Sequence, residues 1–244
     1  LRPLVVDADP AAALSNKRFP WLSMRKIDLE MIPTLAIRVA YTGELGWELH
    51  HPIEMQNRLF DRLMEVGEGV GRKVAPTVTY GRSISIEHTE GVGLTLCGAR
   101  AQNWLRQEKS YRAFGSDLGR DASPLESGLH RFVDQTKDFR GKAAMETRGI
   151  KATCVTVLVE GPQDCDPWGR EALYAEGREG CVGRLTSGGW SVAFGRSIGI
   201  GYVSPDLAAP GTRLKVKMLD GLFDAEVVAE SPYDPENARI RVDG

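Results

Sequence analysis

The sequence predicts an α+β protein: an antiparallel sheet with packed helices, followed by a small C-terminal all-β barrel. In the first 150 residues, alternating apolar segments are interspersed with segments whose apolar residues recur at helical spacing. From Cys154 onward, short runs of strand character are separated by Gly, Pro and Asp, as in small barrels and sandwiches. The pattern changes between Arg148 and Ala152, so we predict one domain at residues 1–150 and a second at 151–244.

The elements of the first domain follow from periodicity. Residues 1–32 are mixed in character and include a turn-prone stretch. Pro33 to Ala40 alternates apolar and polar residues and predicts a strand. The glycine-punctuated segment from Tyr41 to Gly46 predicts a tight turn, which leads into a short strand from Trp47 to His51. Apolar residues at helical spacing then predict an amphipathic helix from Pro52 to Val66.

The second half of this domain is less regular. Gly67 to Gly93 is predicted as a loop with one strand, Val78 to Ile86, and its glycines do not form the G-x-G-x-x-G fingerprint of dinucleotide-binding folds. A second helix is predicted from Gly98 to Lys109, with Glu108 on its apolar stripe, where it either rims the core or faces a site. A polar loop follows, then a predicted strand from Gly128 to Val133.

The predicted barrel follows a short helix that opens at Asp138 to Lys142. We interpret Thr186 to Ser191, which is rich in Gly and Ser, as a flexible loop between two strands. Seven short strands are predicted: Cys154–Val159, Ala172–Ala175, Gly180–Leu185, Ile198–Val203, Arg213–Met218, Phe223–Ala229 and Arg239–Val242.

Charge and hydropathy exclude two classes of protein. The 244 residues contain 31 Lys and Arg against 33 Asp and Glu, a net charge of −2, which argues against a broadly basic nucleic-acid binder. No apolar run approaches the roughly 18–20 residues needed to span a bilayer, and no signal-peptide pattern opens the chain. We therefore expect a soluble protein without nucleic-acid or membrane partners. The chain starts at Leu1 rather than Met, so we expect a processed or truncated start.

Cysteine and histidine spacing indicates no metal site. The four cysteines form no C-x-x-C pair and have no histidine at ligand spacing, so we expect reduced, mostly buried thiols in an intracellular protein. His50 and His51 are adjacent in a predicted strand, where neighbouring side chains point to opposite faces.

Three clusters combine residues that support binding chemistry. Residues 41–48 place Tyr41, two carboxylates and Trp47 around two glycines, residues 104–112 gather charged and aromatic side chains at a helix end, and residues 186–191 surround two glycines with hydroxyls. The sequence contains no P-loop, H-E-x-x-H or EF-hand loop. Residue types alone therefore indicate only a protein that binds a small molecule.

Four ordered segments resemble signatures of the glycine cleavage T-protein family, the tetrahydrofolate-dependent aminomethyltransferases. The first, Arg38–Leu49, is similar to R-x-S-Y-T-G-E-x-G-x-E-[LI]. Leu105–Arg112 resembles L-R-x-E-x-x-Y-R, and Ser123–Leu129 resembles T-P-L-E-x-G-L. Val182–Gly188, with Ile200–Val203 after it, resembles the family's C-terminal barrel.

Two further segments, Leu14–Leu22 and Glu108–Leu118, resemble the folate domain of dimethylglycine and sarcosine dehydrogenases. The resemblance implies an enzyme that transfers a one-carbon unit from an N-methyl or aminomethyl amine to tetrahydrofolate. FAD would be bound only by a separate upstream domain or subunit, since this chain lacks a flavin fingerprint. The implied location is the cytoplasm, or the mitochondrial matrix in a eukaryote.

The resemblance implies three folate-binding residues. Glu48 takes the family position whose carboxylate accepts hydrogen bonds from the donor edge of the pterin ring, Tyr41 lies beside the ring, and Arg106 meets a folate carboxylate or carbonyl. Structural alternatives exist for each residue: a solvated strand residue, a turn residue with its ring on the core, and a surface cation of a helix, respectively.

Two departures from the family pattern concern the reaction itself. The family's catalytic aspartate precedes the segments that match here, so no catalytic residue is assigned, and the chain is expected to correspond to the last two-thirds of a T-protein-like unit. Residues 70–93 are longer than the family's connection and are interpreted as an insertion.

Two other functions stay open at this stage. The chain is alternatively a stand-alone T-protein of glycine cleavage, whose partner is a lipoyl carrier protein. A second alternative is a non-catalytic folate-binding or assembly module, which the missing aspartate favours.

Overall fold

The computed structural model describes residues 1–68, 71–74, 77–80, 82–85, 88–91, 94–161, 165–219 and 221–243. The chain forms two compact units. The first consists of Leu1–Gln102 together with Glu236–Gly244, and the second of Asn103–Pro235. Because this division follows spatial contacts, the domain boundary expected near residue 150 stays a prediction.

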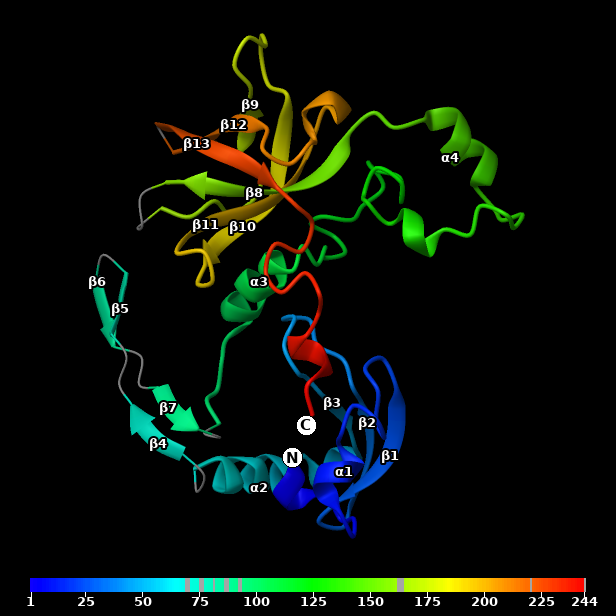
Figure 1. Ribbon diagram of the computed structural model, residues 1–244, viewed down its shortest axis with the longest axis vertical. Helices are drawn as coiled ribbons and strands as arrows, with labels where there is room; N and C mark the ends of the chain where they lie inside the picture. Colours follow the sequence, from blue (N-terminus) through cyan, green and yellow to red (C-terminus); the bar gives the residue numbers. More distant parts are fainter. Residues whose placement is uncertain are drawn as a thin grey trace. The chain divides into compact units, whose positions relative to one another are not determined.

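The first unit contains a three-stranded antiparallel sheet of order β1-β2-β3 (Figure 1). Its strands are β1 (Met24–Leu29), β2 (Ile32–Ile37) and β3 (Glu48–His50). In the register, Leu29 faces Ile32 and Ile37 faces Glu48. The helical elements are η1 (Arg2–Leu4), α1 (Pro10–Ala13), η2 (Ile53–Met55), α2 (Gln56–Glu68) and η5 (Arg239–Arg241).

The core of this unit lies between the sheet and the apolar stripe of α2. Phe19, Leu29 and Ile32 are at most 1% exposed, and Leu59 of α2 packs with them. Leu63 and Val66 extend the same stripe, as the helical spacing predicts. Strand β1 was not predicted, because its side chains are mostly exposed and show no apolar alternation.

The described residues between 71 and 91 form two short antiparallel strand pairs instead of the predicted single strand. β4 (Gly71–Val74) pairs with β7 (His88–Gly91), and β5 (Thr77–Tyr80) pairs with β6 (Arg82–Ser85). The prediction of one strand from Val78 to Ile86 is therefore wrong. The run contains one glycine and no Pro, Asn or Asp, so the sequence pattern does not show that it contains two strands.

The second unit is built around a closed antiparallel barrel of order β10-β11-β8-β13-β12-β9 (Figure 1). The second unit also contains helix α3 (Ala99–Glu108) from Asn103 onward. It further contains the shorter helices η3 (His130–Phe132), α4 (Lys142–Arg148) and η4 (Pro205–Leu207). The strands are β8 (Thr153–Glu160), β9 (Ala172–Tyr174), β10 (Gly183–Ser191), β11 (Arg196–Val203), β12 (Arg213–Met218) and β13 (Gly221–Val228).

Alternate residues of these strands fill the barrel interior. Val157 and Val159 of β8, Leu185 of β10 and Val216 of β12 are fully buried in one apolar cluster. Closure leaves no exposed sheet edge, which explains how strands this short form a stable sheet. The predicted α+β fold with a C-terminal barrel is confirmed.

Strand β10 runs through Thr186–Ser191, so the predicted flexible loop is wrong. The glycines here serve close packing. A Cβ on Gly188 would lie 2.5 Å from the Pro167 carbonyl oxygen, and a Cβ on Gly189 would lie 2.1 Å from the Trp104 ring. In the sequence, glycines needed for close packing look the same as glycines of a turn.

Two other predicted strands are short 3₁₀-helices. Gly128–Val133 contains η3, and Arg239–Val242 contains η5, which belongs to the first unit. Arg239–Val242 alternates polar and apolar residues over only four positions, and Gly128–Val133 is a short run of mixed character, so neither pattern distinguishes a strand from a short irregular segment. The barrel accordingly has six strands instead of seven.

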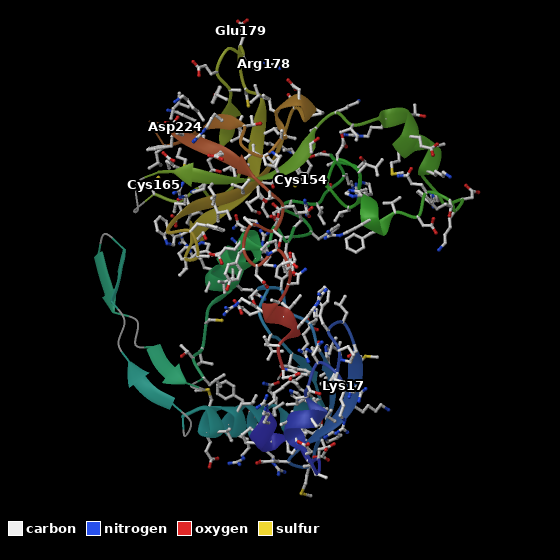
Figure 2. The ribbon with its side chains drawn as sticks, in the orientation of Figure 1. Lys17, Cys154, Cys165, Arg178, Glu179 and Asp224 are labelled. Carbon is white, nitrogen blue, oxygen red and sulfur yellow. The ribbon has the colours of Figure 1, made fainter. Side chains whose placement is uncertain are left out.

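The four cysteines are reduced thiols. Cys154 is buried and Cys165 is half-buried (Figure 2), whereas Cys97 and Cys181 are exposed. The prediction of mostly buried thiols is therefore wrong. Burial raises the pKa of Cys154, although the Arg112 guanidinium opposes this shift.

No helix among the described residues is long and apolar enough to cross a membrane. The same residues contain no cluster of three or more His, Cys, Asp or Glu side chains that could hold a metal ion.

We predict that Gly189→Ala destabilises the protein by about 1–3 kcal/mol, because the new methyl group overlaps the Trp104 ring. Urea unfolding followed by circular dichroism measures the change. Gly119→Ala is the matched control, since nothing lies within 4 Å of its added methyl group. Equal stability of the two variants would contradict the packing role of Gly189.

Candidate functional site

The turn before β3 depends on two glycines. Gly43 has φ 78°, a left-handed conformation that residues with a side chain rarely adopt. A Cβ on Gly46 would lie 2.6 Å from Ala40 Cβ, so the chain passes too close to itself for any other residue. This turn places Tyr41 and Glu48 at its two ends.

Strand alternation directs Glu48 outward. Trp47 packs on Phe19, with ring centroids 4.8 Å apart, and Leu49 packs on the same core. Glu48 and His50 therefore share the opposite face. The Glu48 side chain is 60% exposed, and its Oε2 lies 3.3 Å from His50 Nε2. The carboxylate thus keeps most of its acceptor capacity toward solvent.

The other end of the turn is also accessible. Tyr41 is 39% exposed. Between the two ends, Glu44 is fixed by Arg239, whose Nε lies 2.8 and 2.7 Å from the two carboxylate oxygens. The structure therefore brings Tyr41 and Glu48 to one accessible turn of the first unit. The third predicted residue, Arg106, belongs to the second unit.

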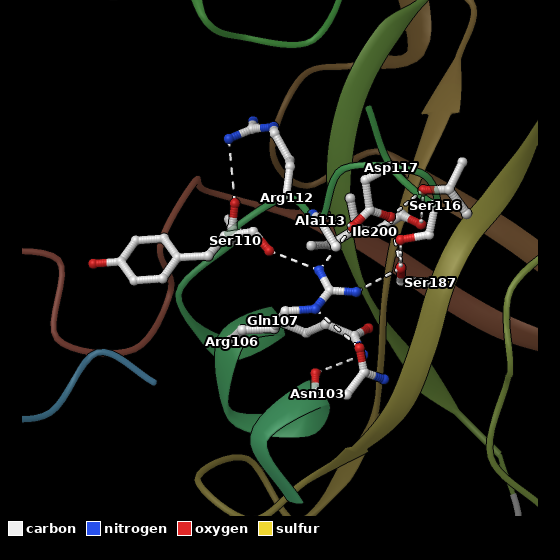
Figure 3. A network of polar contacts seen from close by, with 12 residues as sticks. Asn103, Arg106, Gln107, Ser110, Arg112, Ala113, Ser116, Asp117, Ser187 and Ile200 are labelled. Carbon is white, nitrogen blue, oxygen red and sulfur yellow. Dashed lines mark hydrogen bonds and ion pairs between the residues drawn. The ribbon is translucent and has the colours of Figure 1, made fainter. Parts of the chain in front are cut away.

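Arg106 is buried in a polar network (Figure 3). Its Nε donates to Asn103 Oδ1 at 2.9 Å, and its Nη1 donates to the Tyr111 carbonyl and to Asp117 Oδ2, both at 2.7 Å. Its Nη2 donates to Ser187 Oγ at 2.7 Å. The alternative of a surface cation is therefore wrong, because the side chain is only 3% exposed.

Asp117 is the acceptor at the centre of this network. Its Oδ2 accepts from Arg106 and from the Ala113 amide at 2.9 Å. Its Oδ1 accepts from Thr186 Oγ1 at 2.5 Å and from Ser187 Oγ at 2.6 Å. The carboxylate is fully buried, and these four donors satisfy it.

A bulge in β10 lets two consecutive residues bind one carboxylate. The pairing of β10 with β11 shifts between Leu185 and Ser187. In a regular strand, the side chains of Thr186 and Ser187 point to opposite faces, and a bulge redirects one of them. Sequence reasoning missed Asp117, Thr186 and Ser187 as a network, although the segments that carry the family resemblance contain all three.

Glu108 and Lys109, which follow Arg106, also make hydrogen bonds within the protein that fix the end of α3. Glu108 Oε1 accepts from Ser191 Oγ at 2.6 Å and from the Ala193 amide at 3.0 Å. Glu108 is 3% exposed, and through these two hydrogen bonds its buried carboxylate holds the turn between β10 and β11. Lys109 donates to the carbonyls of residues 233 and 234 at 3.0 and 2.6 Å.

Glu126, in the segment that resembles T-P-L-E-x-G-L, holds the approach to β8. Burial disfavours its ionised form, but donors outweigh this effect and lower the pKa of Glu126 to about 2. These donors are the amides of Ser123 and Lys151, at 2.7 and 2.9 Å, and Arg148 Nε at 3.0 Å. The carboxylate therefore ties the chain before β8 to the loop at Ser123.

Two family models match the chain in order. One is described as the GCVT N-terminal domain and matches residues 4–80 and 85–137. The other is described as the glycine cleavage T-protein C-terminal barrel domain and matches residues 153–234. The second match begins at β8 and includes all six barrel strands.

Curated relatives include dehydrogenases and aminomethyltransferases. The mitochondrial dimethylglycine dehydrogenase of Mus musculus is 35% identical over 95% of this chain and 24% of its own length. The aminomethyltransferase of Cutibacterium acnes is 32% identical over 84% of this chain and 49% of its own length. The chain therefore spans about a quarter of the first relative and about half of the second.

A solved structure has the same fold. The glycine cleavage system aminomethyltransferase T from Bartonella henselae superposes with a TM-score of 0.68. The superposition covers 97% of this chain and 59% of that protein, at 18% sequence identity.

We predict that Asp117→Ala lowers the free energy of unfolding by about 3–5 kcal/mol, because it leaves the Arg106 guanidinium buried without its counter-ion. Asp117→Asn, which keeps the shape, is expected to lose less. Urea unfolding measures both variants.

The control for this prediction is Asp224→Ala, which breaks an exposed ion pair with Lys215. We expect its stability to stay close to that of the wild type, because solvent screens such pairs. A similar decrease in the free energy of unfolding in Asp117→Ala and Asp224→Ala would show that the buried pair stabilises the protein no more than the exposed pair does.

We predict that the stability advantage of the wild type over Glu126→Gln is pH-dependent. The folded-state pKa of Glu126, about 2, lies below its ordinary value of 4.5, so the stabilisation is complete above 4.5 and is lost as the pH falls toward 2. Urea midpoints of both proteins between pH 7 and pH 2.5 measure it. A constant difference over this range would exclude the carboxylate as its source.

Proposed function

Since this chain belongs to the glycine cleavage T-protein family, as its four sequence motifs predict, we propose that it binds tetrahydrofolate and transfers a one-carbon unit to it. The donor is an N-methyl or aminomethyl amine. The observation that carries this proposal is the accessible turn from Tyr41 to Glu48, which retains the family signature and presents its carboxylate to solvent.

The relatives favour one setting for this activity. The dimethylglycine dehydrogenase match covers 95% of the chain, and the sarcosine dehydrogenase of Mus musculus is 29% identical over 97% of it. The match to the Cutibacterium acnes aminomethyltransferase covers 84%. We therefore propose the folate domain of a dimethylglycine- or sarcosine-type dehydrogenase as the first choice, and a stand-alone aminomethyltransferase as the second.

In the proposed mechanism, Glu48 binds the pterin ring of tetrahydrofolate. An ionised carboxylate accepts two hydrogen bonds from the ring's N–H and amino donors, and both are strengthened by the charge. Tyr41, at the other end of the same turn, contributes a ring face or a hydroxyl. The rate gain then comes from holding the amine carbon and the folate nitrogen in position rather than from a covalent intermediate.

For Arg106 the proposed role is mainly structural. The family resemblance implies a contact with a folate carboxylate or carbonyl, which stays a prediction. The partners of Arg106 within the protein already hold its guanidinium, at distances of 2.7–2.9 Å. We propose that its main contribution is to hold α3 against β10.

The proposed reaction also involves a partner domain or protein, which differs between the two settings. In the dehydrogenase setting, a flavin domain or subunit that binds FAD oxidises the amine, and this chain accepts the one-carbon unit. In the aminomethyltransferase setting, a lipoyl carrier protein delivers it. The dehydrogenase relatives are named as mitochondrial, which supports a mitochondrial location in a eukaryote. We propose the matrix in that case and the cytoplasm otherwise.

We predict that Glu48→Gln weakens tetrahydrofolate binding at least about tenfold, because the amide loses the charge and places a donor against the donors of the ring. Isothermal titration of folinic acid, a stable tetrahydrofolate derivative, into the full chain measures the dissociation constant. Glu54→Gln is the control, since Glu54 is an exposed glutamate outside the turn.

An unchanged dissociation constant in a folded Glu48→Gln variant would contradict the proposed role of Glu48. The reaction is tested separately, by ¹H-NMR of methylene-tetrahydrofolate formed from tetrahydrofolate and an aminomethyl donor. Binding without any acceleration would favour a non-catalytic folate-binding module.

A further inference from the structure

The second unit contains a cavity of about 700 Å³ that none of the predicted folate residues lines. Its walls are the loop between Gly115 and Ala122, the segment that includes Arg148 and Lys151, and residues of β10 and β11. Its volume lies within the range of small-molecule sites in proteins.

Basic side chains outnumber acidic ones in these walls. The cations are Arg148, Lys151, Arg170 and Arg184, and the carboxylates are Asp117, Asp121 and Glu126. Each carboxylate has a cation of its own. Asp117 pairs with Arg106, which is not part of the lining, Glu126 pairs with Arg148, and Asp121 lies 3.5 Å from Arg184.

Of the four cations in the walls, Lys151 and Arg170 therefore have no paired carboxylate among the described lining residues. Within the part of the chain that the structure describes, neither side chain makes a hydrogen bond or an ion pair, and only their backbone amides are engaged. Two cations without acidic partners in the wall of one cavity create a positive potential there, which favours an anion.

Two other lining residues, Thr186 and Tyr202, make hydrogen bonds within the protein. Thr186 Oγ1 donates to Asp117, and the Tyr202 hydroxyl donates to the Asp117 carbonyl at 2.8 Å. Burial raises the pKa of Tyr202 to about 12, so its phenol stays neutral. Asp117 is itself held by Arg106 (Figure 3), so the hydrogen bonds of Thr186 and Tyr202 to it are formed without a ligand.

We propose that this cavity binds a small molecule carrying two or more carboxylate or phosphate groups, with Lys151 and Arg170 as its principal contacts. Two unmatched cations select a ligand with at least two negative groups, and the arginine fork binds either oxyanion with two parallel hydrogen bonds. The charged side chains in the walls favour a charged ligand over an uncharged apolar one. The site is independent of the proposed folate chemistry at Glu48.

The test is isothermal titration of the full chain with two probes, pyrophosphate and tricarballylate, which separate phosphate from carboxylate ligands. We expect at least one probe to bind, and the double variant Lys151→Met, Arg170→Met to weaken it at least tenfold. Both side chains are exposed and without partners among the described residues, so the fold is expected to persist. Circular dichroism verifies this.

A charge-matched control separates a built site from general attraction. Lys137→Met, Arg140→Met removes two exposed cations of the same unit that do not line the cavity. It is expected to keep the wild-type affinity, as is Glu48→Gln. Equal weakening in both double variants, or no binding of either probe to the folded wild type at 5 mM, would overturn the proposal.

Discussion

The buried ion pair between Arg106 and Asp117 is the constraint on which the second unit depends. Removing two charges from water is costly, and the cost is offset only when every donor and acceptor finds a partner. Here the partners come from the end of α3, the loop after it and the bulged part of β10. All three segments must meet in one geometry, so the pair fixes how the helix joins the barrel.

The first unit also buries an arginine, and the acceptors of its hydrogen bonds among the described residues are backbone carbonyls instead of a carboxylate. Arg38 is fully buried and donates to the carbonyls of Leu14, Phe19, Ile240 and Val242. Burial lowers the pKa of Arg38, while the Asp243 carboxylate acts in the opposite direction. Because two of these carbonyls belong to the C-terminal segment, a single side chain connects both ends of the sequence. This explains why residues 236–244 belong with the first unit although they follow the barrel.

Much of this architecture can be predicted from the sequence, because the spacing of apolar residues along a strand or helix indicates which of its faces is buried. The barrel strands, α2 and the outward direction of Glu48 opposite Trp47 follow from such patterns. The errors arise where one local pattern serves two structures. Gly188 and Gly189 look like a turn but allow close packing within β10, and Arg239–Val242 alternates like a strand but forms a 3₁₀-helix. The polar network was not predicted, because the partner of a buried charge is decided by tertiary structure.

The structure divides the family signatures into two kinds of residue. In Leu105–Arg112 and Val182–Gly188, the polar groups of Arg106, Glu108, Thr186 and Ser187 bind one another or their neighbours within the protein. In Arg38–Leu49, the buried Arg38 and the partly buried Trp47 fix the turn, while the Glu48 carboxylate stays accessible. A group whose hydrogen bonds are complete gains little from a ligand, since any new bond replaces an existing one. Ligand recognition is therefore expected of groups that retain acceptor or donor capacity, such as Glu48, whereas the internally bonded residues stabilise the unit that contains them.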